Sequence, residues 1–387
     1  MIEQQYGRDE TFFLEHSALT TAKEILQQPA LWRNLAQLLM KQSQEIDAFM
    51  SRLEKLSDLR IILTGAGSSA FIGESLQMML GRGYGLRSEA IATTDIVSAP
   101  EAVLFDVPTL LVSFSRSGES PESMEALRLA SKHINKLYNL VVVCKKESSL
   151  ADMAAQSGDT LILDMPEGSS DLGFAMTSSV SCMMLGTYMA LSGIQASRYA
   201  EYIHQLADSV EKEFKAMDNL ARDIASFPYD RMIYLGSGGL KGLAHEGAVK
   251  SLELTNGKVN ASYESPMGFR HGPKTVINKR TLTVHFIFPL LKTRLYDLDL
   301  LHELVEQKEE NKQAAIADKN GDMPSGLDYA FLYEPVGAEY QELTAYIKGL
   351  LFLQLISLEK SMESGTPTDN PSIGGQVSRV VRGVKIH

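Results

Sequence analysis

A short run of small hydroxyl residues is the first feature of the sequence with the chemistry of a binding site. It extends from Ser115 to Ser120, after an apolar stretch and before Pro121, a residue that favours the first turn of a helix. A helix N-terminus offers free N–H donors, to which Ser117 and Ser120 would add hydroxyl donors and Gly118 a close backbone approach. The pattern therefore predicts a cradle for a phosphomonoester, which is close to dianionic at neutral pH.

The same residues also have a purely structural interpretation, in which Ser120 caps a helix and the other serines only make a turn. A second hydroxyl-rich turn at Gly67–Ser69 also follows a predicted strand, which favours convergence on one ligand. The corresponding turn in the second half, Gly238–Leu240, has no hydroxyl groups. We therefore expect one half of the chain to bind phosphate and the other to lack the site.

A dinucleotide-binding loop is the main rival interpretation. Gly65, Gly67 and Ala70 fit the loose G-x-G-x-x-A pattern. Glu89 lies near the position of the acid that binds the ribose in such loops. The spacing is short and common, however, and it leaves the serines between positions 115 and 120 without a role.

Charged residues recur on one face of a predicted helix in the second half. Glu246, Lys250 and Glu253 fall at i, i+4 and i+7 of the stretch His245–Leu254. In one interpretation they form a solvated, self-paired stripe. In the other, Glu253 points into a cleft as a general base, and Lys250 holds it ionised or meets the substrate. We expect the apolar side of this helix, which includes Leu252, to face the core.

A histidine in a rigid loop is the second acid–base candidate. His271 lies between Arg270 and Gly272–Pro273, a setting that a core histidine does not explain. Its side chain suits proton transfer near neutrality. The sequence contains no G-x-S-x-G motif, so it offers no nucleophile elbow for an α/β-hydrolase mechanism.

Short apolar runs alternate with helical stretches in both halves of the chain, which is typical of a parallel sheet covered on both faces. The strands are expected at 61–64, 89–93, 109–115, 138–144 and 160–163, and again at 232–235, 259–263, 282–288, 314–317 and 331–333. Helical stretches at 174–191 and 200–226 separate the two series. The repeated rhythm predicts an α/β fold with two tandem doubly wound, flavodoxin-like sheets, which bind ligands at the carboxyl ends of their strands.

The expected domain organisation follows from the same pattern. A helical appendage at 1–56 precedes a first, phosphate-binding domain at 57–198. A second domain at 199–365 carries the acid–base candidates, and a turn-rich tail at 366–387 ends the chain.

Composition limits the class of protein. The net charge of −11 disfavours nucleic-acid binding, and no apolar stretch reaches the ~18 residues of a membrane helix. Two cysteines, Cys144 and Cys182, and scattered histidines disfavour disulfides and a zinc site. The start of the chain has no basic, apolar leader. We therefore expect a cytoplasmic protein that uses neither a metal nor a cofactor.

The chain resembles the sugar isomerase (SIS) domain proteins. Their pattern is a Ser-x-Ser-Gly-x-Ser turn, followed in a second domain by K-x-x-E and H-G-P. It is most similar to the D-galactosamine-6-phosphate deaminase family, whose members are also described as tagatose-6-phosphate ketose/aldose isomerases. The resemblance covers nearly the whole chain and includes LTGAGSSAFIG at 63–73, FAMTSS at 174–179, YLGSGGL at 234–240, GFRHGPK at 268–274, YDLDLL at 296–301 and RVVRGVKIH at 379–387.

The resemblance also implies phosphate ligands in the first half. By similarity to the isomerase half of glucosamine-6-phosphate synthase, these ligands are Ser69, Ser115, Ser117 and Ser120. Arg116 replaces a Gln of that relative and would add positive charge to the cradle.

The same relative implies roles for the acid–base candidates. Glu253 resembles the base that moves a proton between C1 and C2 of the open-chain sugar, and Lys250 resembles its neighbour in the active site. His271 resembles the ring-opening residue, which reaches in from another subunit. A homodimer or larger homo-oligomer with shared active sites is therefore implied.

The chain departs from that relative in two places. Residue 2 is Ile2 and the sequence shows no glutaminase domain, so we do not expect the chain to make ammonia from glutamine. The C-terminal lysine of the relative has no clean match, although Arg379 and Lys385 lie in the corresponding region. Two further residues are candidates for the site: Ser68, which precedes Ser69, and Arg270, which precedes His271.

The family implies the conversion of galactosamine 6-phosphate to tagatose 6-phosphate and ammonia through a C2-to-C1 proton transfer. On a hexose 6-phosphate without the amino group, the same proton shuttle is a plain ketose/aldose isomerisation. A non-catalytic phosphosugar sensor would need only the cradle. Such sensors usually carry a DNA-binding helix-turn-helix, which the acidic chain and its non-basic N-terminal helices disfavour.

Overall fold

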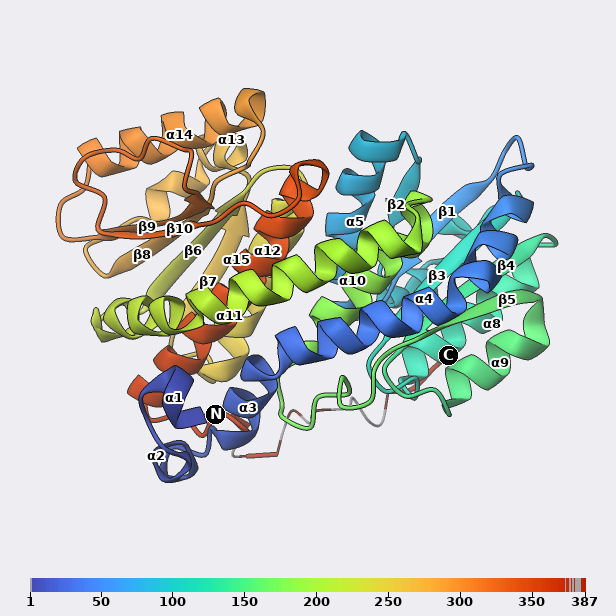
Figure 1. The fold of residues 1–387 in the computed structure, drawn as a ribbon, viewed down its shortest axis with the longest axis horizontal. Coiled ribbons are helices and arrows are strands. Elements are labelled where there is room, and N and C mark those ends of the chain that lie inside the picture. Colours follow the sequence, from blue (N-terminus) through green and yellow to red (C-terminus); the bar gives the residue numbers. More distant parts are fainter. Residues whose placement is uncertain (1, 373, 376, 378, 380–383) are drawn as a thin grey trace. The chain divides into compact units, whose positions relative to one another are not determined.

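The computed structural model describes residues 2–372, 374–375, 377, 379 and 384–387. The chain folds into two compact units, each built around one parallel sheet (Figure 1). The first-sheet unit comprises residues 28–171, 176–204 and 377–387. The second-sheet unit comprises residues 1–27, 172–175 and 205–376.

The first sheet has the strand order β2-β1-β3-β4-β5, and every pairing is parallel. Its strands are β1 Arg60–Thr64, β2 Ser88–Ala90, β3 Thr109–Ser115, β4 Leu137–Val143 and β5 Asp159–Asp164. Every residue of the central strand β3 is buried, as expected for a sheet covered on both faces. The helices of this unit are α4 Gln28–Leu53, α5 Ser68–Tyr84, α6 Thr93–Ser98, α7 Pro100–Val103, α8 Pro121–His133, α9 Ser149–Ser157 and α10 Ser178–Ser192.

The second sheet repeats this topology in the order β10-β9-β8-β6-β7. Its strands are β6 Arg231–Gly236, β7 Asn260–Glu264, β8 Thr281–Phe286, β9 Lys312–Asp318 and β10 Tyr329–Tyr333. The α-helices are α1 Ile2–Tyr6, α2 Glu10–Glu15, α3 Leu19–Leu26, α12 Leu240–Leu254, α13 Pro266–Phe269, α14 Leu291–Glu306 and α15 Gln341–Glu363. Two 3₁₀ turns are η1 Pro273–Val276 and η2 Ala338–Tyr340, and the long helix α11 Ala196–Ser226 contributes residues to both units.

Strand register makes the two sheets comparable residue by residue. Arg60 of β1 is paired with Thr109 of β3, and Arg231 of β6 is paired in the same way with Thr281 of β8. Counting from these pairs, the turn after β8 corresponds to the predicted cradle after β3. The internal duplication is therefore present in the fold, and the predicted α/β class is confirmed.

All ten predicted strands are present, and their ends differ from the expected ones by at most three residues. Two of the strands end two or three residues early. The strand expected at 89–93 ends at Ala90 because Thr93 begins α6. The strand expected at 282–288 ends at Phe286.

The helix expected from residue 174 begins later, at Ser178. The buried carboxylate of Asp171 accepts the main-chain N–H groups of Thr177, Ser178 and Ser179 at 2.8, 2.9 and 3.0 Å. An acidic side chain at this position satisfies donors that the first turn of a helix leaves free. The residues before Ser178 therefore serve to cap the helix.

The N-terminal helices are divided between the units. Helices α1 to α3 belong to the second-sheet unit and α4 belongs to the first-sheet unit, where it packs on α10. Trp32 of α4 donates its ring N–H to Ser181 of α10 at 2.9 Å. The domain boundaries expected after residues 56, 198 and 365 stay predictions. Among the helices of the described residues, none is long and apolar enough to cross a membrane.

Candidate functional site

A pocket of about 120 Å³ lies at the carboxyl ends of the neighbouring strands β1 and β3. Because the strands are parallel, the turns that follow them meet at the same edge of the sheet. The pocket is lined by Ala66, Ser69, Phe114, Ser115, Arg116, Ser117, Ser120, Glu122, Ser123, Met176 and Arg379. All five predicted phosphate ligands are thus in one place.

The cradle turn is held by hydrogen bonds of its own. The Ser115 hydroxyl accepts the N–H of Gly118 at 3.0 Å, and the Ser117 hydroxyl accepts the N–H of Glu119 at 3.2 Å. Gly118 has a φ of 67°, and a Cβ there would lie 2.4 Å from the Ser148 side chain. Glycine is therefore required both by the left-handed backbone and by the close approach of the next turn.

Glu119 ties the cradle to the following helix. Its carboxylate accepts the N–H and the hydroxyl of Ser149, the first residue of α9, at 3.1 and 2.7 Å. These hydrogen bonds lower the pKa of Glu119 because they stabilise its carboxylate, which is thus bound to the start of α9. The acidic residue of the motif is used to fix the loop, and the serines are left to face the pocket.

The position of Ser120 is compatible with both interpretations of the sequence. It is the N-cap of α8, because its hydroxyl accepts the N–H of Ser123 at 3.3 Å, and it also donates to the Ser123 hydroxyl at 2.7 Å. It lines the pocket as well. The capping interpretation is therefore correct but does not exclude a ligand.

Positive charge reaches the pocket through two arginines. Arg116 is 7% exposed, and its Nη2 donates to the main-chain carbonyl of Arg379 at 2.8 Å. Arg379, from the C-terminal tail, lines the same pocket. Lys385, the other tail candidate, lies in a separate hollow formed by α6, α7 and α8. Ser68 is buried at the start of α5, and it is not among the described residues that line the pocket.

In the second-sheet unit, the charged face of α12 is a buried cluster. Lys250 is 1% exposed and lies 3.2 Å from the Glu246 carboxylate and 3.7 Å from that of Glu253. The solvated stripe is therefore wrong for Glu246 and Lys250, because both side chains are buried. The expected core position of Leu252 is also wrong, since this side chain is 43% exposed.

Glu253 differs from Glu246 in its surroundings, because its side chain is 37% exposed whereas Glu246 is fully buried. A proton-transfer group must be accessible to its substrate, and of these two glutamates only Glu253 is exposed to solvent. The buried ammonium of Lys250 stands beside it as a fixed positive charge. This arrangement suits a general base that works as a carboxylate.

His271 lies in the loop between α13 and η1, and its residue is exposed. Its neighbours fix the loop: Glu303 of α14 accepts the Nε–H of Arg270 at 3.0 Å and also pairs with Lys274. The hydrogen bond from Lys274 lowers the pKa of Glu303. Arg270 therefore anchors the loop through Glu303, while His271 faces solvent.

The turn of the second sheet that matches Gly67–Ser69 is occupied by the chain itself. Gly239, which corresponds to Ser68, donates its N–H to the Glu342 carboxylate at 2.9 Å. Asp297 accepts the Ser237 hydroxyl at 2.5 Å and the N–H of Phe288 at 2.9 Å. Two internal carboxylates therefore accept the donors of the turns that follow β6 and β8.

Other features bear on the rival interpretations. Glu89, the acid of the proposed dinucleotide loop, is paired with Arg60 at 2.7 Å, which accounts for its position without a ribose. Burial raises the pKa of the Cys144 thiol to about 12, so it is not a thiolate nucleophile at neutral pH. Among the described residues, no cluster of three His, Cys, Asp or Glu side chains has the arrangement of a metal site.

Sequence reasoning missed three residues at these sites. Glu246 was grouped with a surface stripe, and the helical spacing alone did not show which side α15 covers. Asp297 and Glu342 were not singled out, although Asp297 lies within the stretch 296–301 that carries the family resemblance.

Comparison with known proteins extends this picture. The SIS domain family matches residues 56–192. The chain is 40% identical to a Streptomyces coelicolor protein whose name gives it, provisionally, as a D-galactosamine-6-phosphate deaminase, with 97% of both chains covered. It is 37% identical to the Escherichia coli D-galactosamine-6-phosphate deaminase AgaS over 95% of both chains. The solved structure of the Escherichia coli tagatose-6-phosphate ketose/aldose isomerase matches with a TM-score of 0.86 and 34% identity, covering 95% of this chain and 96% of that one.

Proposed function

Because the chain belongs to the SIS-domain family and, within it, to the D-galactosamine-6-phosphate deaminases, we propose that it converts galactosamine 6-phosphate to tagatose 6-phosphate and ammonia. The observation that carries the proposal is the first-sheet pocket. It brings Ser69, Ser115, Ser117 and Ser120 together with the Arg116 side chain. Hydroxyl donors and a guanidinium around one small pocket suit a sugar phosphate dianion.

The cradle anchors the phosphate and takes no part in bond making. Its donors are fixed by the Ser115–Gly118 hydrogen bond and by the attachment of Glu119 to α9. A site whose donors are already in place loses little entropy when the anion binds. The binding energy of this remote group is then available to position the reacting end of the sugar.

The proton transfer is assigned to Glu253. In the open-chain aldose form of the substrate, its carboxylate takes the proton from C2, and the electrons form an enolamine. Return of the proton to C1 gives a ketimine of the ketose. Water adds to the ketimine carbon, and ammonia leaves, so that tagatose 6-phosphate results. The Lys250 ammonium lies 3.7 Å from the Glu253 carboxylate and supplies a positive charge beside the reacting group.

Ring opening is assigned to His271. The cyclic sugar must open before C2 becomes acidic, and this step needs a group that exchanges a proton near neutral pH. His271 is exposed, and its loop is held by the Arg270–Glu303 ion pair. We place His271 in the active site of a second subunit, so the working enzyme is a homo-oligomer.

A second activity is favoured by the name of one structural relative, a tagatose-6-phosphate ketose/aldose isomerase. The same base and the same C2-to-C1 transfer would then act on a hexose 6-phosphate without an amino group. Free thiols at Cys144 and Cys182 support a reducing, cytoplasmic location for either reaction.

The test is ammonia release from galactosamine 6-phosphate, followed in parallel with formation of the ketose phosphate. The deaminase produces the two in equal amounts. Ketose formation from an unaminated hexose 6-phosphate, with no ammonia from the amino sugar, would identify the isomerase instead. Tight binding of the amino sugar phosphate without either product would identify a sensor.

A further inference from the structure

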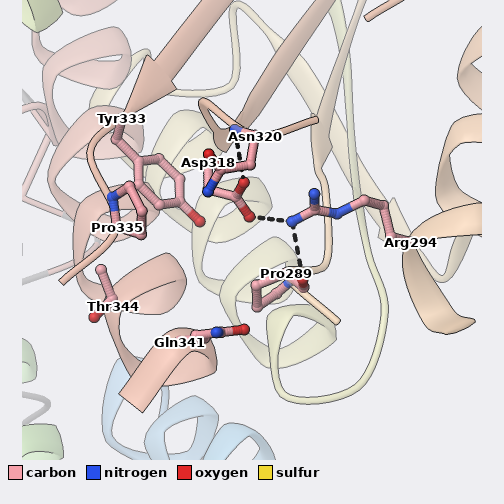
Figure 2. A pocket seen from close by; sticks show the side chains of 8 residues that line it. All are labelled: Pro289, Arg294, Asp318, Asn320, Tyr333, Pro335, Gln341 and Thr344. Atoms are coloured by element: carbon pink, nitrogen blue, oxygen red, sulfur yellow. Dashed lines mark hydrogen bonds and ion pairs between the residues drawn. The ribbon is translucent and has the colours of Figure 1, made fainter. Parts of the chain in front are cut away.

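A second pocket lies at the carboxyl edge of the second sheet, and the proposed reaction does not use it. It has a volume of about 130 Å³ and is reached from the ends of β9 and β10 and from the start of α15 (Figure 2). In open α/β sheets this edge is where ligands bind. The volume is that of roughly four water molecules, enough for one hydroxyl-bearing edge of a small ligand.

The charged groups of this pocket neutralise each other. Arg294 forms an ion pair with Asp318, and the side chains are only 11% and 8% exposed. Arg294 also donates to the carbonyls of Phe288 and Pro289 at 3.0 and 2.9 Å, and Asp318 accepts the N–H of Asn320 at 3.0 Å. Breaking a closed, buried pair of this kind is costly, so a charged ligand gains little by competing for either partner.

The anion-binding donors beside the pocket are also taken. Phe288, which corresponds to Arg116 of the cradle, donates its N–H to Asp297, and Gly239 donates its N–H to Glu342. Burial is the largest influence on the pKa of Asp297 and raises it to about 6, although hydrogen bonds from Ser237 and Phe288 lower it. A phosphate would therefore meet occupied donors and nearby carboxylates.

The amides of Asn320 and Gln341 are the uncharged polar groups of the pocket. Figure 2 shows the Gln341 amide and the Tyr333 side chain beside one space, with Pro289 as an apolar wall. Within the part of the chain that the structure describes, the side-chain amides of Asn320 and Gln341 make no hydrogen bond to another residue. Amides and a phenol both donate to and accept from hydroxyl groups, and an aromatic face beside a proline suits C–H surfaces.

We propose that this pocket binds an uncharged polyhydroxy ligand, a free monosaccharide or a related polyol, separately from the phosphosugar site of the first sheet. Each sheet edge then selects a different form of sugar. The first supplies serine hydroxyls and arginines to a phosphate, and the second supplies two amides beside an aromatic ring and a closed ion pair to hydroxyl groups.

The experiment is calorimetric titration of the full chain with D-galactose and, separately, with inorganic phosphate. Galactose is expected to bind the wild-type protein saturably, with a millimolar Kd. Gln341→Leu removes one amide at the pocket and should weaken galactose binding about ten-fold, the effect of one well-placed hydrogen bond. The matched variant Ser117→Ala/Ser120→Ala, in the cradle, should keep galactose binding and lose phosphate binding.

Asn320→Leu is the second pocket variant, and it serves if Gln341→Leu disturbs the start of α15. Asn320 is exposed and precedes no helix, so its substitution leaves the fold intact. Equal thermal midpoints for the variants and the wild type establish that the loss is local. The proposal is overturned if galactose does not saturate the wild-type chain, or if the cradle variant loses galactose while both pocket variants retain it. Phosphate binding that survives in the cradle variant and disappears in the pocket variants would equally overturn it.

Discussion

The Lys250 ammonium lies 3.2 Å from the Glu246 carboxylate, and both side chains are shielded from solvent on α12. Glu253 lies 3.7 Å from the same ammonium with its side chain 37% exposed. One lysine therefore joins a carboxylate inside the protein to a carboxylate at its surface. This difference separates the structural from the chemical role of the two glutamates.

Substitution of the two glutamates is expected to give opposite results. Glu246→Gln leaves the buried Lys250 without its nearest countercharge and should cost about 3 kcal/mol of unfolding free energy. Glu253→Gln should lower turnover by about a hundred-fold or more, because a general base is lost, with little change in stability. Denaturant unfolding and ammonia release measure the two effects.

Glu306→Gln, an exposed substitution on α14, is the control for both measurements. It should change neither stability nor turnover. Near-normal turnover in Glu253→Gln would remove this residue from the mechanism.

The two C-terminal candidates are separated by their location. Arg379 lines the cradle pocket and its carbonyl accepts from Arg116, whereas Lys385 lies in another hollow. Arg379→Ala is therefore expected to raise KM for the phosphosugar about ten-fold, the loss of one charge-assisted contact. Lys385→Ala should leave KM within about two-fold, in the range of surface substitutions.

Initial-rate kinetics at varied substrate decide between them. A larger effect of Lys385→Ala on KM would show that the tail supplies the second basic group from Lys385. Equal, small effects would mean that neither tail residue contacts the phosphate.

Gly118 and Gly67 form a matched pair for the backbone of the cradle. Both have positive φ, 67° and 56°, but a Cβ at Gly118 would lie 2.4 Å from Ser148 while one at Gly67 meets nothing within 4 Å. Gly67, with φ 56° and ψ −133°, has a backbone that residues with a Cβ rarely adopt, so Gly67→Ala is expected to cost about 1–3 kcal/mol of stability from conformational strain alone. Gly118→Ala carries the steric clash in addition and should also distort the phosphate donors.

Thermal unfolding and KM are the measurements for this pair. The expected order is a larger loss of stability and a larger rise in KM for Gly118→Ala. The close approach of Ser148 would have no importance for the cradle if the two alanine variants behaved alike.

A buried carboxylate makes stability depend on pH. Burial raises the pKa of Asp218 to about 7, with a further contribution from Glu359, and Arg8 and Arg222 only partly oppose it. The folded state then holds a proton that the unfolded state, with a pKa near 3.9, has lost. The stabilisation is complete below the unfolded pKa and disappears as pH rises through 7, a change on the order of a few kcal/mol.

Asp218→Asn is expected to remove this dependence, because the amide does not titrate. Unfolding free energies at pH 5 and pH 8 should differ less in the variant than in the wild type. Asp47→Asn, an exposed position on α4, should leave the difference unchanged. A wild-type stability that rises between these pH values would contradict the assignment.

Local sequence patterns were sufficient for the strands and for the cradle. The apolar run 109–115 is a fully buried strand, and the serines after it line one pocket. These features depend on neighbouring residues and on the rule that parallel strands end at a common edge.

Features that depend on distant segments were not predictable in the same way. Helix α15 is buried on nearly every side, so its own periodicity does not show which face of α12 it covers. The faces of α12 that its neighbours cover include Lys250 and leave Leu252 exposed. The carboxylates of Asp297 and Glu342 reach the second turn from residues far along the chain, which no local motif reveals.

The placement of His271 in a neighbouring subunit leads to a complementation test. Glu253→Gln and His271→Ala should each be nearly inactive as pure proteins. In a mixed dimer, one site combines the intact Glu253 of one subunit with the intact His271 of the other, and the second site lacks both. Random mixing makes half of the dimers mixed, so about a quarter of wild-type turnover should return.

Co-expression of the two variants, followed by ammonia release and gel filtration, measures this recovery. Each variant expressed alone is the control and should show no recovery. No gain in the mixture would place His271 and Glu253 in the same subunit's site. A monomeric wild-type protein with full turnover would contradict a shared site altogether, because His271 would then have to act within its own chain.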